Sequence, residues 1–321
     1  MDRGEAVLET LQASLPDWLV VLAAVVTRLG DVWVLIAVGL GASWLLAWRG
    51  GSNVHGRIEP EVDSEESSPR STARPEFVEG PWVLGLVVGG LAFVTALKYA
   101  FALPRPVAVV AVPDAIPSAL VPLYVSSVTI DGYAFPSGHA VGATVTYGLL
   151  AVALRVGTPR VRLATAAIVA GAVGLSRLVL VVHYPADVIV GFAVGLVYLV
   201  GALSTLERVS IDRTTASFAL ALGLAVVALI ASGFSPRSIQ YVALAAFGLG
   251  GWLVGRRSVG STGATVGRGW IGLSAVGLVV GALGGRLGIV VSGAVVGVLA
   301  AAPATVLRWR LRKMRGDRSS R

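Results

Sequence analysis

Three short polar segments of the sequence combine basic residues and histidines near the ends of apolar runs. They read KYAFALPRP (98–106), FPSGHA (135–140) and SRLVLVVHYPAD (176–187). Their chemically relevant residues, in chain order, are Lys98, Arg105, Ser137, Gly138, His139, Arg177, His183 and Asp187. Three cations favour a polyanionic ligand, and the guanidinium fork matches phosphate oxygens. Two histidines can then act as nucleophile and acid, so these residue types predict a phosphoryl-transfer site.

The middle segment opens a long apolar run and predicts the start of a helix. Pro136 suits the first helical position, where its missing N–H costs nothing. The free backbone N–H groups and the positive end of the helix dipole favour phosphate binding at a helix start. Because Ser137 and Gly138 are small, we expect a phosphate to approach this helix end closely.

The two histidines differ in their sequence neighbours. Asp187 lies four residues after His183, in the first turn of the next helix. Such a carboxylate can hold one ring nitrogen protonated and direct the other at phosphorus. His139 has no carboxylate near it in sequence, which favours the acid role. Two alternatives stay open: Asp187 as a helix-start acid that the helix dipole stabilises, and Ser176 as a donor to a backbone carbonyl.

The elements that must position these residues are membrane-spanning helices. The chain has 321 residues, of which 55% are hydrophobic and 14% charged, and its mean hydropathy is +0.80. Apolar runs near 20 residues recur, and this length crosses a bilayer core of about 30 Å. We predict nine spans, over residues 31–49, 82–101, 138–156, 161–181, 186–204, 215–233, 239–255, 270–285 and 287–307.

Residues 17–29 are too short to span comfortably, and Gly30 and Asp31 interrupt them, which predicts an interfacial or re-entrant helix. The predicted fold is therefore all-α: a polytopic membrane helical bundle with a five-span core after the re-entrant helix, and about four extra spans at the carboxyl end. We divide the chain into a catalytic membrane region (1–210), an accessory membrane region (211–308) and a basic cytoplasmic tail (309–321). The polar segment 50–80 predicts a disordered cytoplasmic loop.

The distribution of basic residues predicts the orientation in the cell membrane. Of the 26 Lys and Arg residues, 19 fall on one side of the predicted bundle, and this side should be cytoplasmic. The amino terminus then lies outside and the carboxyl terminus inside. Alternating spans place all three polar segments on the extracytoplasmic face. The basic tail has a sufficient explanation as a positive-inside anchor, so no nucleic-acid partner is expected.

Paired glycines recur in the predicted spans, at Gly85/Gly89, Gly191/Gly195, Gly277/Gly281 and Gly293/Gly297. Such pairs allow helices to pack closely. A homodimer through these faces is an alternative use. The chain contains no cysteine, which excludes disulfides and thiol chemistry.

Together the three segments resemble the signature of the type 2 phosphatidic acid phosphatase and vanadium haloperoxidase superfamily, in residue type and in spacing. The similarity covers roughly residues 15–205. The phosphate-binding residues that this resemblance implies are Lys98, Arg105, Ser137, Gly138 and Arg177. It also implies His139 as the acid, His183 as the nucleophile and Asp187 as its partner. The family hydrolyses phosphate without a metal, so no metal and no cofactor are expected.

The resulting hypothesis is an integral-membrane phosphatase that hydrolyses a lipid phosphate through a phosphohistidine intermediate. Candidate substrates are phosphatidic acid, phosphatidylglycerol phosphate and an isoprenyl (pyro)phosphate. The weakly charged loop 107–134 borders the site and is predicted to form part of the lipid entrance. Three alternatives remain: a lipid phosphotransferase, a vanadate-dependent peroxidase, which the many spans disfavour, and a phosphate or lipid transporter with the cations as a selectivity ring.

Overall fold

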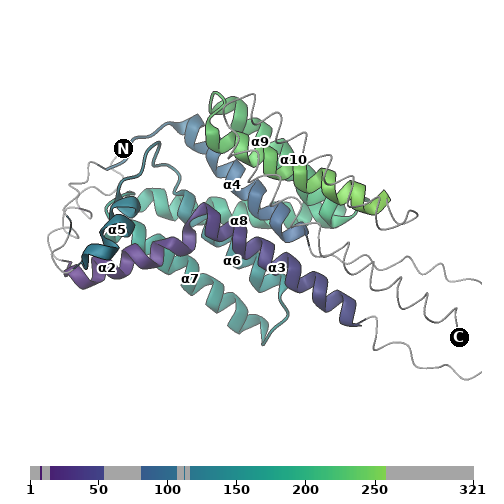
Figure 1. Ribbon diagram of the computed structural model, residues 1–321, viewed down its shortest axis with the longest axis horizontal. Coiled ribbons are helices and arrows are strands. Elements are labelled where there is room, and N and C mark those ends of the chain that lie inside the picture. The colour runs from purple at the N-terminus through teal and green to yellow at the C-terminus, as the bar shows by residue number, and fades with distance from the viewer. Residues whose placement is uncertain (1–7, 9–14, 54–80, 107–111, 113–115, 258–321) are drawn as a thin grey trace, which may run out of the picture.

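The computed structural model describes residues 8, 15–53, 81–106, 112 and 116–257, and every regular element in these ranges is helical (Figure 1). The elements, in chain order, are α2 (Asp17–Val26), η1 (Thr27–Gly30), α3 (Val32–Asn53), α4 (Trp82–Phe101), η2 (Ser118–Leu120), α5 (Val121–Val128), α6 (Gly138–Ala153), α7 (Pro159–Val179), α8 (Pro185–Arg208), α9 (Arg213–Ala231) and α10 (Pro236–Arg257). The prediction of an all-α fold is therefore confirmed for the described part of the chain.

Four of the described helices, α4, α7, α8 and α9, are long and apolar enough to cross a membrane. A fifth span results if α2 with η1 and α3, which are bent by 50° at their junction, count as one broken span. Helix α6 has 16 residues, or about 24 Å at 1.5 Å per residue, and is shorter than the predicted span 138–156. These helices are consistent with a membrane protein. The predicted spans 270–285 and 287–307, the tail and most of the loop 50–80 lie outside the described residues.

Helix α4 is the centre of the bundle. Its first fourteen positions are buried almost without exception, because α9 and α10 cover one side of it and α3 and α6 the other. Figure 1 shows α9 and α10 side by side along one flank of the molecule, next to α4. Residues 213–257 thus share one hydrophobic core with the predicted catalytic region. The domain boundary at residue 210 stays a prediction.

Two of the predicted glycine pairs form close contacts between helices of the same chain. A Cβ at Gly85 would lie 2.5 Å from Oγ of Ser217, so a larger residue would push α9 away from α4. A Cβ at Gly191 would lie 2.9 Å from Cβ of Ala140, where α8 packs on α6. The two other pairs lie outside the described residues. A homodimer stays a prediction that these contacts do not address.

Candidate active site

The helix ends that carry the three polar segments meet at one end of the bundle. The backbone N–H of Ser137 donates to the carbonyl oxygen of Asp187 at 2.9 Å, which joins the start of α6 to the start of α8. Arg105, four residues after the end of α4, lies with Nη1 3.2 Å from Nε2 of His183. The first and third segments are therefore in direct contact, and the second is hydrogen-bonded to the third.

Lys98 completes the cluster from the last turn of α4. A Cβ at Gly138 would lie 3.3 Å from Cε of Lys98, so the small residue at the start of α6 leaves room for this side chain. Electrostatic interactions link His183 to four of the predicted residues, namely Lys98, Arg105, Arg177 and His139. The structure thus brings all eight predicted site residues together, and their roles remain predictions.

Helix α6 begins at Gly138, with Ser137 as its N-cap residue. The Ser137 hydroxyl accepts a hydrogen bond from the backbone N–H of Ala140 at 3.5 Å. The prediction that Pro136 occupies the first helical position is therefore wrong. Pro136 lies one residue before the N-cap. Ser137 takes the N-cap position because its side chain can accept a hydrogen bond from a free N–H of the first turn.

His183 lies in the connection between α7 and α8 and is almost completely buried, with 1% of its surface exposed. Its Nδ1 is 3.5 Å from Oδ2 of Asp187. The same Oδ2 accepts a hydrogen bond from the backbone N–H of Tyr184 at 3.0 Å. Asp187 therefore caps the start of α8 and faces His183 at once, so the two uses that the sequence left open are combined.

Burial and the surrounding charges keep His183 neutral. Burial lowers the pKa of His183 well below its ordinary value of 6.5, and the positive charges of Lys98, Arg105 and Arg177 lower it further. A neutral imidazole has a lone pair on one ring nitrogen. Because the Arg105 guanidinium can only donate, Nε2 beside it is the nitrogen that carries the lone pair, while Nδ1 faces Asp187 at 3.5 Å without a hydrogen bond among the described residues.

Arg105 and Lys98 also hold the segment that leads into α6. Arg105 donates from Nε to the carbonyl of Gly132 at 3.1 Å, and Lys98 donates from Nζ to the carbonyl of Tyr133 at 2.8 Å. Burial lowers the pKa of Arg105 to about 10, with a smaller contribution in the same direction from Arg237 at the start of α10. Arg105 thus keeps its charge at neutral pH. Arg237 is a cation near the site that the motifs did not indicate.

Arg177 is a buried cation, only 1% exposed, in the last turn of α7. Its Nη1 donates to the hydroxyl of Thr27 in η1. In the part of the chain that the structure describes, its Nε and Nη2 have no hydrogen-bond partner. The neighbouring Ser176 donates to the carbonyl of Val173 at 2.6 Å, which is the backbone use that the sequence left open.

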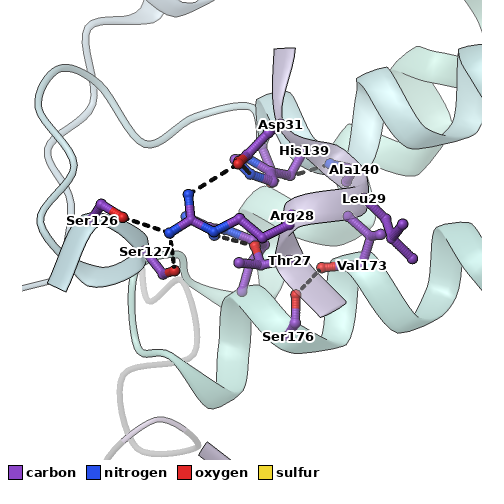
Figure 2. A network of polar contacts seen from close by, with 12 residues as sticks. Thr27, Arg28, Leu29, Asp31, Ser126, Ser127, His139, Ala140, Val173 and Ser176 are labelled. Carbon is purple, nitrogen blue, oxygen red and sulfur yellow. Dashed lines mark hydrogen bonds and ion pairs between the residues drawn. The ribbon is translucent and has the colours of Figure 1, made fainter. Parts of the chain in front are cut away.

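His139 has a carboxylate partner that the motifs did not indicate. Its Nε2 lies 3.1 Å from Oδ1 of Asp31, at the junction between η1 and α3 (Figure 2). The argument that assigned the acid role to His139 from the lack of a nearby carboxylate is therefore corrected, because the tertiary structure supplies one. The available signal was the pair of charged residues, Arg28 and Asp31, inside an apolar run, where ionisable groups usually mark function.

The predicted entrance loop 107–134 contains a helix, α5, which packs against α2. An apolar cluster joins the two helices to the end of α7; its buried members are Ala23, Ala24, Ile116, Tyr124, Val128, Leu180 and Val182. Two of its members, Leu180 and Val182, lie just before His183 in the chain. Helix α5 was not expected from the sequence, because its eight residues are too few to show a helical pattern.

Among the described residues, no group of three or more His, Asp and Glu side chains is arranged to bind a metal ion. The polar groups of the site are mainly hydrogen-bond donors and cations, a set that suits an anion.

Comparison with known proteins gives one match. The model of the PAP2 superfamily matches residues 80–210, which include all three polar segments. No curated protein and no solved structure matches the chain.

Proposed function

We propose, from the membership of residues 80–210 in the PAP2 superfamily, that this protein is an integral-membrane phosphatase that hydrolyses a lipid phosphate or an isoprenyl (pyro)phosphate. Membership of this superfamily suggests a phosphatase-type activity in a helical membrane protein. The lipid substrate, the phosphohistidine intermediate and the independence from metal are the specific parts of the proposal.

The observation that carries the proposal is the environment of His183. A buried neutral imidazole has Asp187 at one ring nitrogen and the Arg105 guanidinium at the other. A cation that lies 3.2 Å from a nucleophilic nitrogen would also hold a phosphate oxygen beside it. A phosphate held there would already lie next to the nucleophilic nitrogen, so the translational and rotational entropy of bringing the two together is lost on binding and not in the reaction step.

The reaction then proceeds in two steps. The lone pair of His183 Nε2 attacks phosphorus, the bond from phosphorus to the lipid oxygen breaks, and His139 gives a proton to that oxygen. In the second step water attacks phosphorus, its proton passes to His139, and the bond between nitrogen and phosphorus breaks. Inorganic phosphate leaves, and both histidines return to their initial states.

The three cations supply the charge stabilisation that a phosphoryl group needs. Arg177 is buried with two donor atoms that have no partner among the described residues, and Lys98 and Arg105 approach from α4 and the connection after it. Preorganised cations beside buried groups stabilise developing charge strongly. This supports hydrolysis without a metal.

The surroundings of the site favour a substrate with a lipid tail. Helix α2, which packs against α5, has exposed apolar side chains, including Trp18 (65% exposed) and Leu22 (48%). An exposed apolar surface of this kind is compatible with contact to lipid tails. Together with the excess of basic residues on the other side of the bundle, it supports a site at the outer leaflet that a lipid reaches laterally.

Phosphate release tests the proposal. The purified protein is incubated without added metal with phosphatidic acid, phosphatidylglycerol phosphate and an isoprenyl diphosphate, and inorganic phosphate is measured for wild type and for His183→Ala. We expect release from at least one lipid by wild type and a loss of about 10³-fold or more in the variant. Transfer of the phosphate to an added alcohol in place of water would indicate a phosphotransferase. A His183→Ala variant with full activity would refute the proposal.

A further inference from the structure

We propose that Asp31 is a positioning residue for His139: its carboxylate accepts a hydrogen bond from Nε2–H of the imidazole, so that Nδ1 is the nitrogen that exchanges a proton with the substrate. This inference rests on the proposed phosphatase function and adds to it a fourth segment of the chain. None of the three polar segments contains Asp31, and the part of the chain that matches the family model begins 49 residues after it.

The first support is the contact itself. Oδ1 of Asp31 lies 3.1 Å from Nε2 of His139, although 108 residues separate them in the chain. The approach depends on the broken helix, which bends by 50° at this junction. It also depends on Gly30, because a Cβ there would lie 2.7 Å from Cδ2 of His139 and 2.6 Å from Cγ1 of Val173. The break in the helix and the glycine together allow the Asp31 carboxylate to approach the imidazole of His139 to hydrogen-bond distance.

The second support is that the carboxylate is held from its other side. Oδ2 of Asp31 lies 3.1 Å from Nη1 of Arg28. Nη2 of Arg28 donates to the hydroxyls of Ser126 and Ser127 on α5, at 2.5 and 2.9 Å. Figure 2 shows Arg28 between these serines and Asp31. Both oxygens of the carboxylate are therefore engaged, which fixes its orientation toward His139.

The third support is the charge around His139. Two cations, Arg177 from α7 and Lys98 from α4, act on this histidine together with the Asp31 carboxylate. The positive end of the α6 dipole is also close, because His139 lies in the first turn of that helix. All three positive groups disfavour an imidazolium, the form that an acid must take before it gives up a proton. The hydrogen bond and the negative charge of Asp31 act in the opposite direction and favour the imidazolium.

The proton balance follows from this assignment. Asp31 keeps a proton on Nε2 throughout the reaction. The imidazolium gives its Nδ1 proton to the lipid oxygen as the bond from phosphorus to that oxygen breaks, and Nδ1 then accepts a proton from the attacking water. One nitrogen thus serves both steps, as an orienting carboxylate allows in other histidine-dependent enzymes.

The test compares two leaving groups. An alkyl oxygen, as in dioctanoyl phosphatidic acid, needs protonation as it leaves, whereas the p-nitrophenolate of p-nitrophenyl phosphate does not. Asp31→Asn keeps the shape and one acceptor oxygen, removes the charge, and replaces the second acceptor oxygen with an NH2 group. We expect it to lower kcat for the alkyl substrate about 10- to 100-fold and kcat for p-nitrophenyl phosphate about threefold or less. Asp31→Glu, which keeps the charge, should recover part of the alkyl activity.

Four controls make the result specific. Asp17→Asn removes an exposed carboxylate from the same broken helix and should change neither rate. His139→Ala should show the same dependence on the leaving group as Asp31→Asn. The double variant should be no slower than His139→Ala alone, because the two residues act as one unit. Inhibition by vanadate, a tetrahedral phosphate analogue, checks that each variant retains its phosphate site.

Equal losses on both substrates in a variant that vanadate still inhibits would overturn the inference, and so would an unchanged alkyl rate. If Asp31→Asn loses vanadate inhibition, Asp31→Glu becomes the deciding variant. The inference would then be overturned if the activity of Asp31→Glu on the alkyl substrate were as low as that of His139→Ala. Failure of the proposed function is separate, because it would appear in wild type as no phosphate release from any substrate.

Discussion

Replacement of Arg177 by methionine should separate activity from stability. The side chain is 1% exposed, donates to the Thr27 hydroxyl from Nη1, and has no hydrogen-bond partner among the described residues for Nε and Nη2. A buried cation with so few partners costs several kcal/mol in lost hydration. We therefore expect Arg177 to contribute more to ligand binding than to the stability of the fold.

The structure sets the size of the effect on activity. Each hydrogen bond to a charged group contributes about 1.5–3 kcal/mol. If Nε and Nη2 both bind phosphate oxygens, the variant loses about 3–6 kcal/mol, or about two to four decades in kcat/KM at 1.36 kcal/mol per decade. The effect on stability has the opposite sign. Methionine removes the cost of the buried charge, and the Thr27 hydroxyl loses one partner at a cost of about 1 kcal/mol.

The assay measures kcat/KM for a lipid phosphate and the thermal unfolding midpoint in detergent, each with and without vanadate. We expect Arg177→Met to lose activity, to keep or raise its unfolding temperature, and to lose the stabilisation by vanadate that wild type shows. Arg162→Met, at the opposite end of α7, is the matched control and should keep full activity. An Arg177→Met protein with a clearly lowered midpoint and an activity loss no larger than its loss of folded protein would refute the reasoning.

Two further predictions concern acid pH and helix packing. Because burial and neighbouring cations lower the pKa of His183 well below 6.5, its neutral form persists as the pH falls through that value. The acid limb of kcat/KM, corrected for the ionisation of the substrate phosphate, should therefore lie below pH 6.5, and a limb centred above pH 6.5 would contradict the assigned environment. Gly191→Ala should lower stability by about 1–3 kcal/mol and reduce activity, because its Cβ would lie 3.0 Å from the carbonyl oxygen of Ser137, the cap of α6. Gly201→Ala on the same helix, where a Cβ would have no heavy atom within 4 Å, should leave activity unchanged; similar unfolding temperatures for the two variants would argue against the close α6–α8 contact.

Much of the site follows from local features of the sequence. The predicted span 82–101 coincides with α4, and the spans that begin near residues 161 and 186 correspond to α7 and α8. Hydrophobic runs of this length are visible in a short window, and consecutive antiparallel helices place their alternate ends on the same face. Lys98, Arg105, His139, Arg177 and His183 lie at such ends. Their convergence was therefore predictable from residue types, spacing and span order.

The contacts of Asp31, Arg28 and α5 could not be predicted from local features of the sequence. The pairing of Asp31 with His139 depends on the angle at which a broken helix passes the start of α6, and no window of sequence contains both residues. The double use of Asp187, as helix cap and as partner of His183, depends on the direction of one carboxylate. Hydropathy and motif spacing specify which residues reach the site, because both are properties of neighbouring positions. The packing of distant helices decides which atoms meet there, because an interaction over about 3 Å depends on the positions of all the elements between.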